Sequence, residues 1–495
     1  MEAKQIAGIG RRLKLLLREF RDCFGRSEPR EHLEEYVHGQ ASNLNRKSVE
    51  PIALETGNAP RTLQRFLESV KWDEVRMRDR LQQIVVRDYA DPHAIGVIDE
   101  SGHPKKGRHT AGVKRQWCGR TGKVDNCVVS VHTGYIAGDF QCILDSDVYL
   151  PREWADDPER RRETYIPDDV VYRKKTGIAL DQVRRALSNG IRVAAWTFDE
   201  WYGRDREFLV GLESLGQDYV GEIPSNFVVW LKEPRVLFKP RPQDLHGSGK
   251  RKRFPRLARQ TLRACEARNL LTYSRIFQRQ EWQRYRIKDG EKGPMVWDVK
   301  HAVCYVPGPD GLPGLAHTLI VARSVTDPSE VKYFISNRLP ASRGVSLKWM
   351  LWVAFARWPI EHCFRQAKDE LGMDHFEVRG WRCIHRHLYI TQVSHLFCAR
   401  EHQRLREKND CNGVSDGRAG SPGDGCVVRC PRPGSRHPLD DVPRGRGSNR
   451  LLPAPQQGSP AVPHQDDPAP PPRNGHQAGQ PAVLHPADLL GYVAL

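Results

Sequence analysis

The sequence has no apolar run long enough to cross a membrane. None of its stretches approaches the roughly 18 consecutive apolar residues of a membrane-spanning helix. The N-terminus, MEAKQIAGIGRRLKLLLREF, has neither the apolar segment nor the cleavage site of a secretory signal peptide, and its apolar spacing favours an amphipathic helix. We therefore expect a cytoplasmic protein without a membrane segment.

Paired cysteines with the spacing of metal ligands are also absent. The chain has 12 cysteines but no Cys-x-x-Cys motif. Only Cys426 and Cys430 lie close together, and no further ligands complete a site around them. This pattern indicates reduced thiols and argues against a zinc finger or a disulfide framework.

Acidic residues are outnumbered by basic ones. The chain has 61 Asp and Glu against 78 Lys and Arg, which gives a net charge of +17. A protein this basic most often binds nucleic acid, an acidic partner or an anionic membrane surface. Its 495 residues are enough for two to four domains.

Residues 1–90 are predicted to form a helical, possibly DNA-binding domain. The segment SVEPIALETGNAPRTLQRFLESV (48–70) has the pattern of a helix, a turn at Gly57 and a second helix that carries Arg61 and Arg65. Two interpretations are open: a helix-turn-helix whose arginines contact DNA, or a three-helix bundle with solvated arginines.

Strands and helices alternate over residues 91–223, which predicts an α/β core with a mixed sheet. Residues 224–345 interrupt this pattern with a β-rich insertion, and residues 346–408 supply the helical second part of the core. Within the insertion the strand pattern covers LTYSRIF, WQRYRIKDG, MVWDVKHAVCYV and HTLIVARSV. The helical region 349–372 contains Pro359, which must begin or kink a segment of it.

The last segment, residues 409–495, contains no Lys, Glu, Ile, Phe, Trp, Thr or Met. It is rich in Pro, Gly, Arg, Ala and Asp, so we expect a disordered tail. This shift in composition is what out-of-frame reading of a GC-rich gene produces. A frameshift after Lys408 is therefore our hypothesis, with a natural disordered linker as the alternative.

Three acids stand in similar settings. Asp99, next to Glu100, ends a short apolar run, Asp199 ends another, and Glu361 lies in the helical region that begins near Arg357. A single such acid is more often a turn residue or a helix cap. Carboxylates at strand ends of an α/β sheet nevertheless lie where ligand crevices form. Three of them would suit two Mg²⁺ or Mn²⁺ ions, which could activate a water or hydroxyl that attacks a phosphodiester.

Cations surround these acids. Adjacent carboxylates repel one another, so their counter-charge could be a metal ion, the protein's own cations, or both around a phosphate. A cationic loop follows Asp99, and three more cations flank Glu361 at helical spacing; each set could contact phosphate or be a solvated, salt-bridged surface. The residues are Lys105, Lys106, Arg108 and His109 in the loop, and Arg357, Arg365 and Lys368 around Glu361.

Three segments resemble the motif regions of bacterial insertion-sequence transposases of the DDE superfamily. They are VIDESGHPKKGRHTAGVKRQWCGRTGKVDNC, TFDEWYGRD and RWPIEHCFRQAKDELGMDHFEVRGW. The likeness covers residues 20–405 and is to the branch whose ribonuclease-H-like domain is split by an all-β insertion before the last acid. It implies that Asp99, Asp199 and Glu361 are the catalytic, metal-binding triad.

The resemblance also has consequences for DNA contacts. A Tyr-Arg-Glu-Lys signature of that branch is matched by Arg357, Glu361 and Lys368, whereas Ala354 stands where Tyr is expected. Trp282 and Trp297 are candidates for an aromatic residue of the insertion that stacks on a flipped base, with core packing as the alternative.

The fold implied is a ribonuclease-H-like mixed sheet with flanking helices, preceded by a helical domain and followed by the tail. The function implied is DNA transposition, in which a homodimer in a synaptic complex binds terminal inverted repeats and target DNA. The protein would then be nucleoid-associated when bound to DNA. A ribonuclease-H-like nuclease without strand joining and an inactivated DNA-binding relic are the alternatives.

Overall fold

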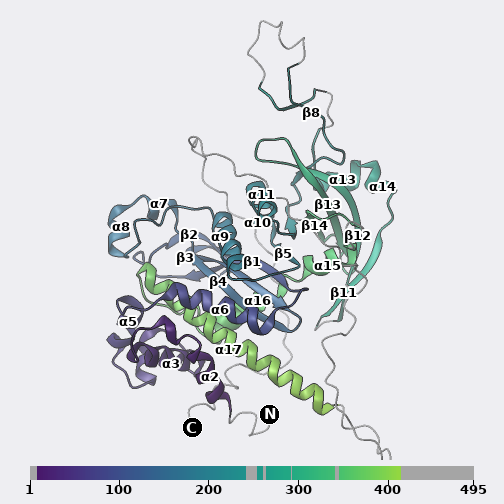
Figure 1. Cartoon of the computed structure of the whole chain (residues 1–495). Helices are drawn as coiled ribbons and strands as arrows, with labels where there is room; N and C mark the ends of the chain where they lie inside the picture. Colours follow the sequence, from purple (N-terminus) through teal and green to yellow (C-terminus); the bar gives the residue numbers. More distant parts are fainter. Residues whose placement is uncertain (1–7, 241–252, 260–262, 291–292, 341–344, 414–495) are drawn as a thin grey trace, which may run out of the picture.

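The computed structural model describes residues 8–240, 253–259, 263–290, 293–340 and 345–413 (Figure 1). From residue 414 onward, the predicted disordered tail lies outside these ranges. Residues 409–413 belong to the last helix, α17 (Trp381–Gly413). Across the described ranges, no helix is both long and apolar enough to span a bilayer.

The N-terminal part is helical. The helices on either side of Gly57 are present. This glycine has a φ of +73°, a backbone conformation that residues with a Cβ rarely adopt. The helices are α2 (Ile9–Arg18), α3 (Glu28–Ala41), α4 (Val49–Glu55), α5 (Pro60–Glu68) and α6 (Glu74–Tyr89), with a 3₁₀ turn at Arg21–Cys23.

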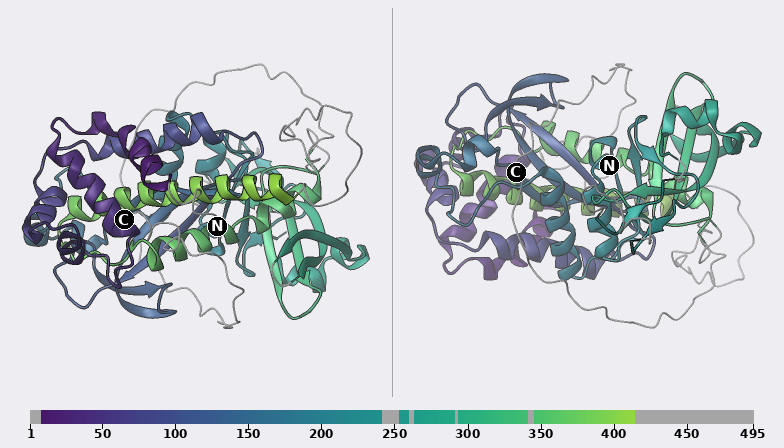
Figure 2. Two further views of the ribbon diagram at one scale, coloured as in Figure 1. Left: turned by 90° about the horizontal axis from the view of Figure 1, so that it is seen from below. Right: turned by 90° about the horizontal axis from the view of Figure 1, so that it is seen from above.

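Helices α2, α3, α5 and α6 pack against α17, which runs along the molecule from the N-terminal helices toward the β-rich part (Figure 2). Arg386 of α17 makes a polar contact with this part of the chain, and its side chain is only 1% exposed. Its guanidinium pairs with Glu74 and donates to backbone carbonyls at the end of α5 and in the loop that follows. The carbonyl oxygens belong to Phe66, Leu67, Val70 and Trp72.

The first sheet is mixed. Its strands are β1 (Ile95–Pro104), β2 (Lys114–Cys118), β3 (Lys123–Ala137), β4 (Phe140–Val148) and β5 (Ala195–Phe198). β3 pairs antiparallel with β1, β2 and β4, whereas β5 pairs parallel with β1. A parallel bridge between Trp196 and Tyr219 places β6 (Val220–Ile223) beside β5.

The strand that carries Asp99 is longer than predicted. β1 continues to Pro104, because residues 99–104 pair with β3 after parallel pairing with β5 has ended at Ile98. The prediction that Asp99 ends the strand and that a loop follows at once is therefore wrong. Asp99 lies instead at the position where β5 stops and β1 goes on.

The second sheet is joined to the first through β6. β6 also pairs antiparallel with β14 (Val331–Ser336), so both sheets share a strand. The other strands of the order β11-β12-β13-β14-β6 are β11 (Gln283–Gly290), β12 (Gly293–Pro307) and β13 (Pro313–Ser324). Four two-residue strands lie earlier in this part of the chain: β7 (Val228–Val229), β8 (Val236–Leu237), β9 (Arg256–Leu257) and β10 (Cys265–Glu266).

The prediction of a strand at LTYSRIF is wrong. This segment belongs to two short helices, α13 (Ala267–Tyr273) and α14 (Arg275–Arg279). Leu270 and Phe277 are buried while Tyr273 and Ile276 are exposed. Leu270 lies in α13 and Phe277 in α14, and the apparent alternation of polar and apolar residues concealed the break between these two helices.

Helices cover both faces of the first sheet. Arg152–Ala155 (α7), Pro158–Glu163 (α8), Lys175–Ser188 (α9), Glu200–Gly203 (α10) and Arg206–Ser214 (α11) follow in sequence, and Leu347–Phe355 (α15) and Trp358–Asp369 (α16) come before α17. Ile95 and Val97 pack in one cluster with α15 and α16, whereas Ile98 packs in the other with α9 and α11. Alternation along β1 therefore directs Asp99 toward α16 and Glu100 toward α9.

Candidate active site

Asp99 is held in place through both carboxylate oxygens. Oδ1 accepts a hydrogen bond from the backbone N–H of Glu100 at 2.8 Å, and Oδ2 accepts one from Nη1 of Arg357 at 3.1 Å. The residue is only 7% exposed. A buried carboxylate with two fixed donors has a well-defined orientation.

Asp199 is the N-cap of α10, directly after β5. Its Oδ1 accepts from the backbone N–H groups of Trp201 at 3.0 Å and Tyr202 at 3.3 Å. Because β5 runs parallel to β1 and Ile98 pairs with Phe198, Asp199 and Asp99 follow equivalent positions of neighbouring strands. The cap explains why the chain turns from strand to helix at this residue.

Glu361 comes to this site from α16. Pro359 stands in the first turn of α16, so the predicted helical region is two helices, with the break just before Arg357. Nη1 of Arg357 also donates to Oε1 of Glu361 at 2.9 Å. One guanidinium nitrogen thus contacts Asp99 and Glu361, and about half of the Glu361 side chain is exposed.

The electrostatics of Asp99 link the three acids. Burial, opposed by the charge of Arg357 and reinforced by the charges of Asp199 and Glu361, raises the pKa of Asp99 to about 7. A carboxyl group destabilised by two like charges favours a nearby cation. The structure therefore brings the three predicted acids into one electrostatic cluster.

Glu100 has a different counter-charge, which sequence reasoning missed. Nζ of Lys175, the first residue of α9, lies 3.1 Å from Oε1 and 3.0 Å from Oε2 of Glu100. The two adjacent acids pair with cations from opposite faces of the sheet: Asp99 pairs with Arg357 and Glu100 pairs with Lys175. In the sequence, only the adjacent pair Lys174-Lys175 could have drawn attention to Lys175.

The predicted cationic loop is divided by the fold. Nζ of Lys105 donates to the carbonyl oxygens of Phe376 at 2.7 Å and Asp374 at 3.2 Å, and burial lowers its pKa to about 8. Lys106, Arg108 and His109 are exposed. Only these three are placed to meet a ligand directly, and phosphate contact by any of the four stays a prediction.

The cations predicted around Glu361 are divided in the same way. Arg357 and Lys368 are each 7% exposed, and burial lowers the pKa of Lys368, whereas Arg365 is exposed. Arg61 and Arg65 are exposed on α5, where Arg61 pairs with Glu68 at 3.1 Å. The DNA contacts expected of these residues also stay predictions.

The two candidate tryptophans have different surroundings. Trp297 is 6% exposed and its ring centroid lies 5.1 Å from that of Phe355, so it is a core residue. Trp282 is partly exposed, with Nζ of Lys300 4.8 Å and the guanidinium carbon of Arg323 4.1 Å from its ring centroid. An accessible aromatic ring between two cations is the better candidate for stacking on a nucleobase.

The fit of the site to a divalent metal depends on how its acids are grouped and on their chemistry. Within the ranges that the structure describes, no three His, Cys, Asp or Glu side chains are grouped closely enough to hold a metal ion. The donor set is nevertheless suitable, since carboxylate oxygens are hard ligands and the three acids repel one another at Asp99. Arg357, in contact with two of them, supplies the positive charge in the present arrangement.

A family comparison matches residues 19–294 to the DDE superfamily endonucleases. The chain belongs to this family. The matched range covers more than half of the chain and includes Asp99 and Asp199, and it ends before Glu361. The family resemblance inferred from the three motif segments is confirmed, and DDE superfamily enzymes use divalent metals.

A relative of this DDE superfamily endonuclease is the probable transposase for insertion sequence element IS701 from Microchaete diplosiphon. The two are 30% identical over 197 residues, which is 39% of this chain and 49% of that protein. The match thus spans about half the length of the relative. A solved piggyBac transposase synaptic complex with hairpin DNA is 11% identical, with a TM-score of 0.29 over 85% of this chain and 83% of that chain. A likeness this weak carries no argument.

Proposed function

We propose that this protein is a DNA transposase that cleaves and joins strands at the ends of an insertion sequence. The observation that carries the proposal is the cluster of Asp99, Asp199 and Glu361 around Arg357 in a DDE superfamily endonuclease. The similarity of part of the chain to a probable insertion-sequence transposase supports it.

The proposed fold assignment is a ribonuclease-H-like core. When β6 is counted with the first sheet, five of its strands lie in the order β4-β3-β1-β5-β6. Neighbours among β4, β3 and β1 are antiparallel, and β5 and β6 run parallel to β1. In this assignment the core consists of residues 91–223 and 346–408, residues 224–345 are the insertion, and residues 1–90 are a separate helical domain. The strand shared by the two sheets is where the insertion begins.

Asp99, Asp199 and Glu361 would hold two Mg²⁺ or Mn²⁺ ions. When bound, such ions activate an oxygen nucleophile and stabilise the leaving oxygen of a phosphodiester. The residues of the chain do the positioning: the Glu100 N–H fixes Asp99, the N-terminus of α10 fixes Asp199, and Arg357 aligns Asp99 with Glu361. Because Arg357 is buried among acids, its charge limits their mutual repulsion.

The proposed partner is double-stranded DNA, as terminal inverted repeats and as target, bound by a homodimer in a synaptic complex. End-labelled duplexes that carry the inverted repeats bordering this reading frame would test cleavage. We expect Mg²⁺-dependent nicking at the repeat boundary and none on a scrambled duplex of equal length. Cleavage of both duplexes at equal rates would argue against an end-specific transposase.

The exposed loop cations should contribute to DNA affinity through phosphate contacts. In the double variant Lys106→Gln/Arg108→Gln, we expect the slope of log affinity against log salt to fall by about 2, since each phosphate contact on duplex DNA contributes about 0.9. The measurement is fluorescence anisotropy with the repeat duplex across a salt series. The control Arg184→Gln/Arg192→Gln removes the same charge near the C-terminal end of α9 and should leave the slope unchanged. Equal slopes for both double variants would show that the loop cations are solvated surface charges that do not contact phosphate.

Trp282 should contact the DNA end. Replacing Trp282 with Ala should weaken binding of the repeat duplex by about 10-fold, because stacking of a base on an aromatic ring contributes about 1–3 kcal/mol. Trp282→Phe keeps an aromatic face and should retain most of the affinity. The same anisotropy assay measures both variants. If Ala and Phe behave alike, the ring does not stack on a base.

A further inference from the structure

Lys175 lies at the point where three parts of the site's supporting structure meet. It opens α9, on the face of the sheet opposite α16, and its side chain is only 12% exposed. Its ammonium is within 3.1 Å of both carboxylate oxygens of Glu100, the residue next to Asp99. The proposed mechanism gives this partly buried ion pair no role.

The same ammonium contacts the turn that carries Asp199. Nζ of Lys175 lies 4.9 Å from the ring centroid of Trp201 and 5.4 Å from that of Tyr149. The backbone N–H of Trp201 is a donor to Asp199. Lys175 therefore connects, through one residue on each side, the backbone that orients Asp99 with the backbone that orients Asp199.

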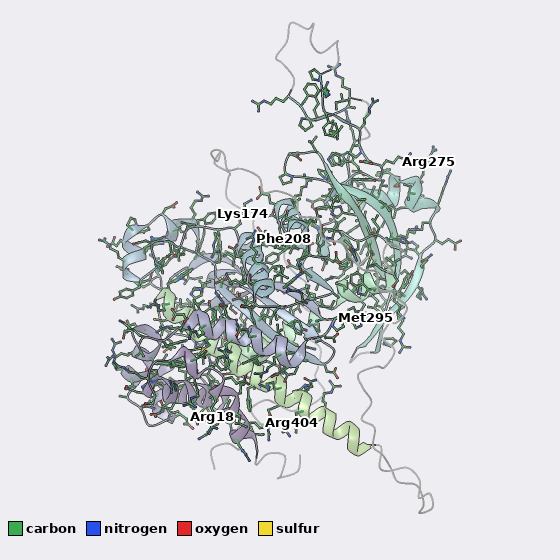
Figure 3. The ribbon with its side chains drawn as sticks, in the orientation of Figure 1. Arg18, Lys174, Phe208, Arg275, Met295 and Arg404 are labelled. Carbon is green, nitrogen blue, oxygen red and sulfur yellow. The ribbon has the colours of Figure 1, made fainter. Side chains whose placement is uncertain are left out.

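The start of α9 is itself fixed to the same region. The hydroxyl of Thr176 donates to Oδ2 of Asp205 at 2.7 Å, and Asp205 is the N-cap of α11, which follows the α10 turn. Lys174, the preceding residue, pairs with Glu207 at 2.9 Å, but both side chains are more than half exposed. Lys174, labelled in Figure 3, stands immediately before α9. The two neighbouring lysines thus make similar pairs, one partly buried and next to the site, the other exposed.

We propose that Lys175 is a positioning residue for the proposed metal site, setting the separation of Asp99 and Asp199 through Glu100 and Trp201. The inference rests on the proposed function. Partners one shell removed from a metal's ligands typically change metal affinity or activity by about 10–100-fold when they are mutated. Lys175 contacts Glu100 and Trp201, so its proposed effect on Asp99 and Asp199 passes through these two neighbours.

Metal binding by the full chain without DNA is the first test. Calorimetry with Mn²⁺ should show Lys175→Met binding about 10-fold or more weaker than the unaltered protein. Lys175→Arg retains the charge and should recover most of the affinity. Lys174→Met, the matched control, should bind as the unaltered protein does. Mn²⁺ affinity equal in Lys175→Met and Lys174→Met would overturn the inference.

Cleavage kinetics and stability separate positioning from a purely structural role. Lys175→Met should raise the Mg²⁺ concentration for half-maximal cleavage by about 10-fold or more, with the Kd for the repeat duplex within twofold and the urea midpoint close to that of Lys174→Met. Loss of stability with an unchanged Mg²⁺ midpoint would show that the ion pair only supports the fold. Glu100→Gln should shift the midpoint in the same direction, and the double variant Glu100→Gln/Lys175→Met should lose less than the sum of the two.

Failure of the inference can be told apart from failure of the proposed function. If the unaltered protein binds Mn²⁺ no better than Asp99→Asn does, the proposed metal site is wrong, and the positioning role proposed for Lys175 fails with it. If Asp99→Asn abolishes binding and Lys175→Met does not weaken it, only the inference fails.

Discussion

Asp99→Asn is expected to lower the rate of DNA strand cleavage by about 10³-fold or more, the scale at which loss of a central catalytic group acts. The substitution keeps the size of the side chain and an oxygen that can accept the Glu100 N–H. It removes the negative charge that contacts Arg357 and that would hold the metal. Single-turnover cleavage of the repeat duplex in Mg²⁺ measures the effect.

The control for this substitution is Asp139→Asn. Asp139 lies between β3 and β4, is well exposed and pairs with Arg406 at 3.3 Å. It should cleave at the unaltered rate, and both variants should bind the duplex with unaltered affinity. Cleavage by Asp99→Asn within a few fold of the unaltered protein would remove Asp99 from the site. Asp199→Asn and Glu361→Gln should behave like Asp99→Asn.

Arg386→Met is expected to lower the free energy of unfolding by about 3–5 kcal/mol, as breaking a buried ion pair from one side does. The substitution removes the buried cation that pairs with Glu74 and leaves several backbone carbonyl oxygens without the donor that the guanidinium now supplies. These acceptors lie at the junction of the N-terminal helices with α17. Urea unfolding followed by tryptophan fluorescence measures the change.

Arg382→Met is the matched control, because Arg382 pairs with the same Glu74 at 2.9 Å with a side chain that is 60% exposed. An exposed ion pair contributes about 0–1 kcal/mol, so this variant should stay within about 1 kcal/mol of the unaltered protein. Similar losses in the two variants would mean that burial of Arg386 is not what makes its contacts matter.

The convergence of the two strand-borne acids could be predicted from the sequence. Asp99 and Asp199 each follow an apolar run in an alternating α/β pattern, and parallel pairing of such runs brings their ends together. The extension of β1 beyond Asp99 could not be predicted in this way, because ESGHP has little strand propensity and becomes a strand only by pairing with β3.

The partners of the charged residues were not predictable from local sequence. Arg357 and Glu361 are four residues apart, so their ion pair follows from helical spacing, but the contact of Arg357 with Asp99 joins residues 258 positions apart. Lys105 and Lys106 are adjacent, yet only Lys105 meets the carbonyls of residues 374 and 376. Which lysine is buried depends on tertiary packing. Composition and residue spacing do not indicate which of the two lysines is buried.

Strand joining is the most direct test of the central claim. The measurement combines the full chain, Mg²⁺, labelled duplexes that end in the inverted repeats with free 3′-hydroxyls, and a circular plasmid target. The account predicts labelled plasmid that carries the repeat at a new junction, absent with Asp199→Asn. Plasmid or duplex hydrolysis without any joined product would identify a nuclease instead, and tight repeat binding with neither hydrolysis nor joining would identify an inactivated relic; either result would contradict the account.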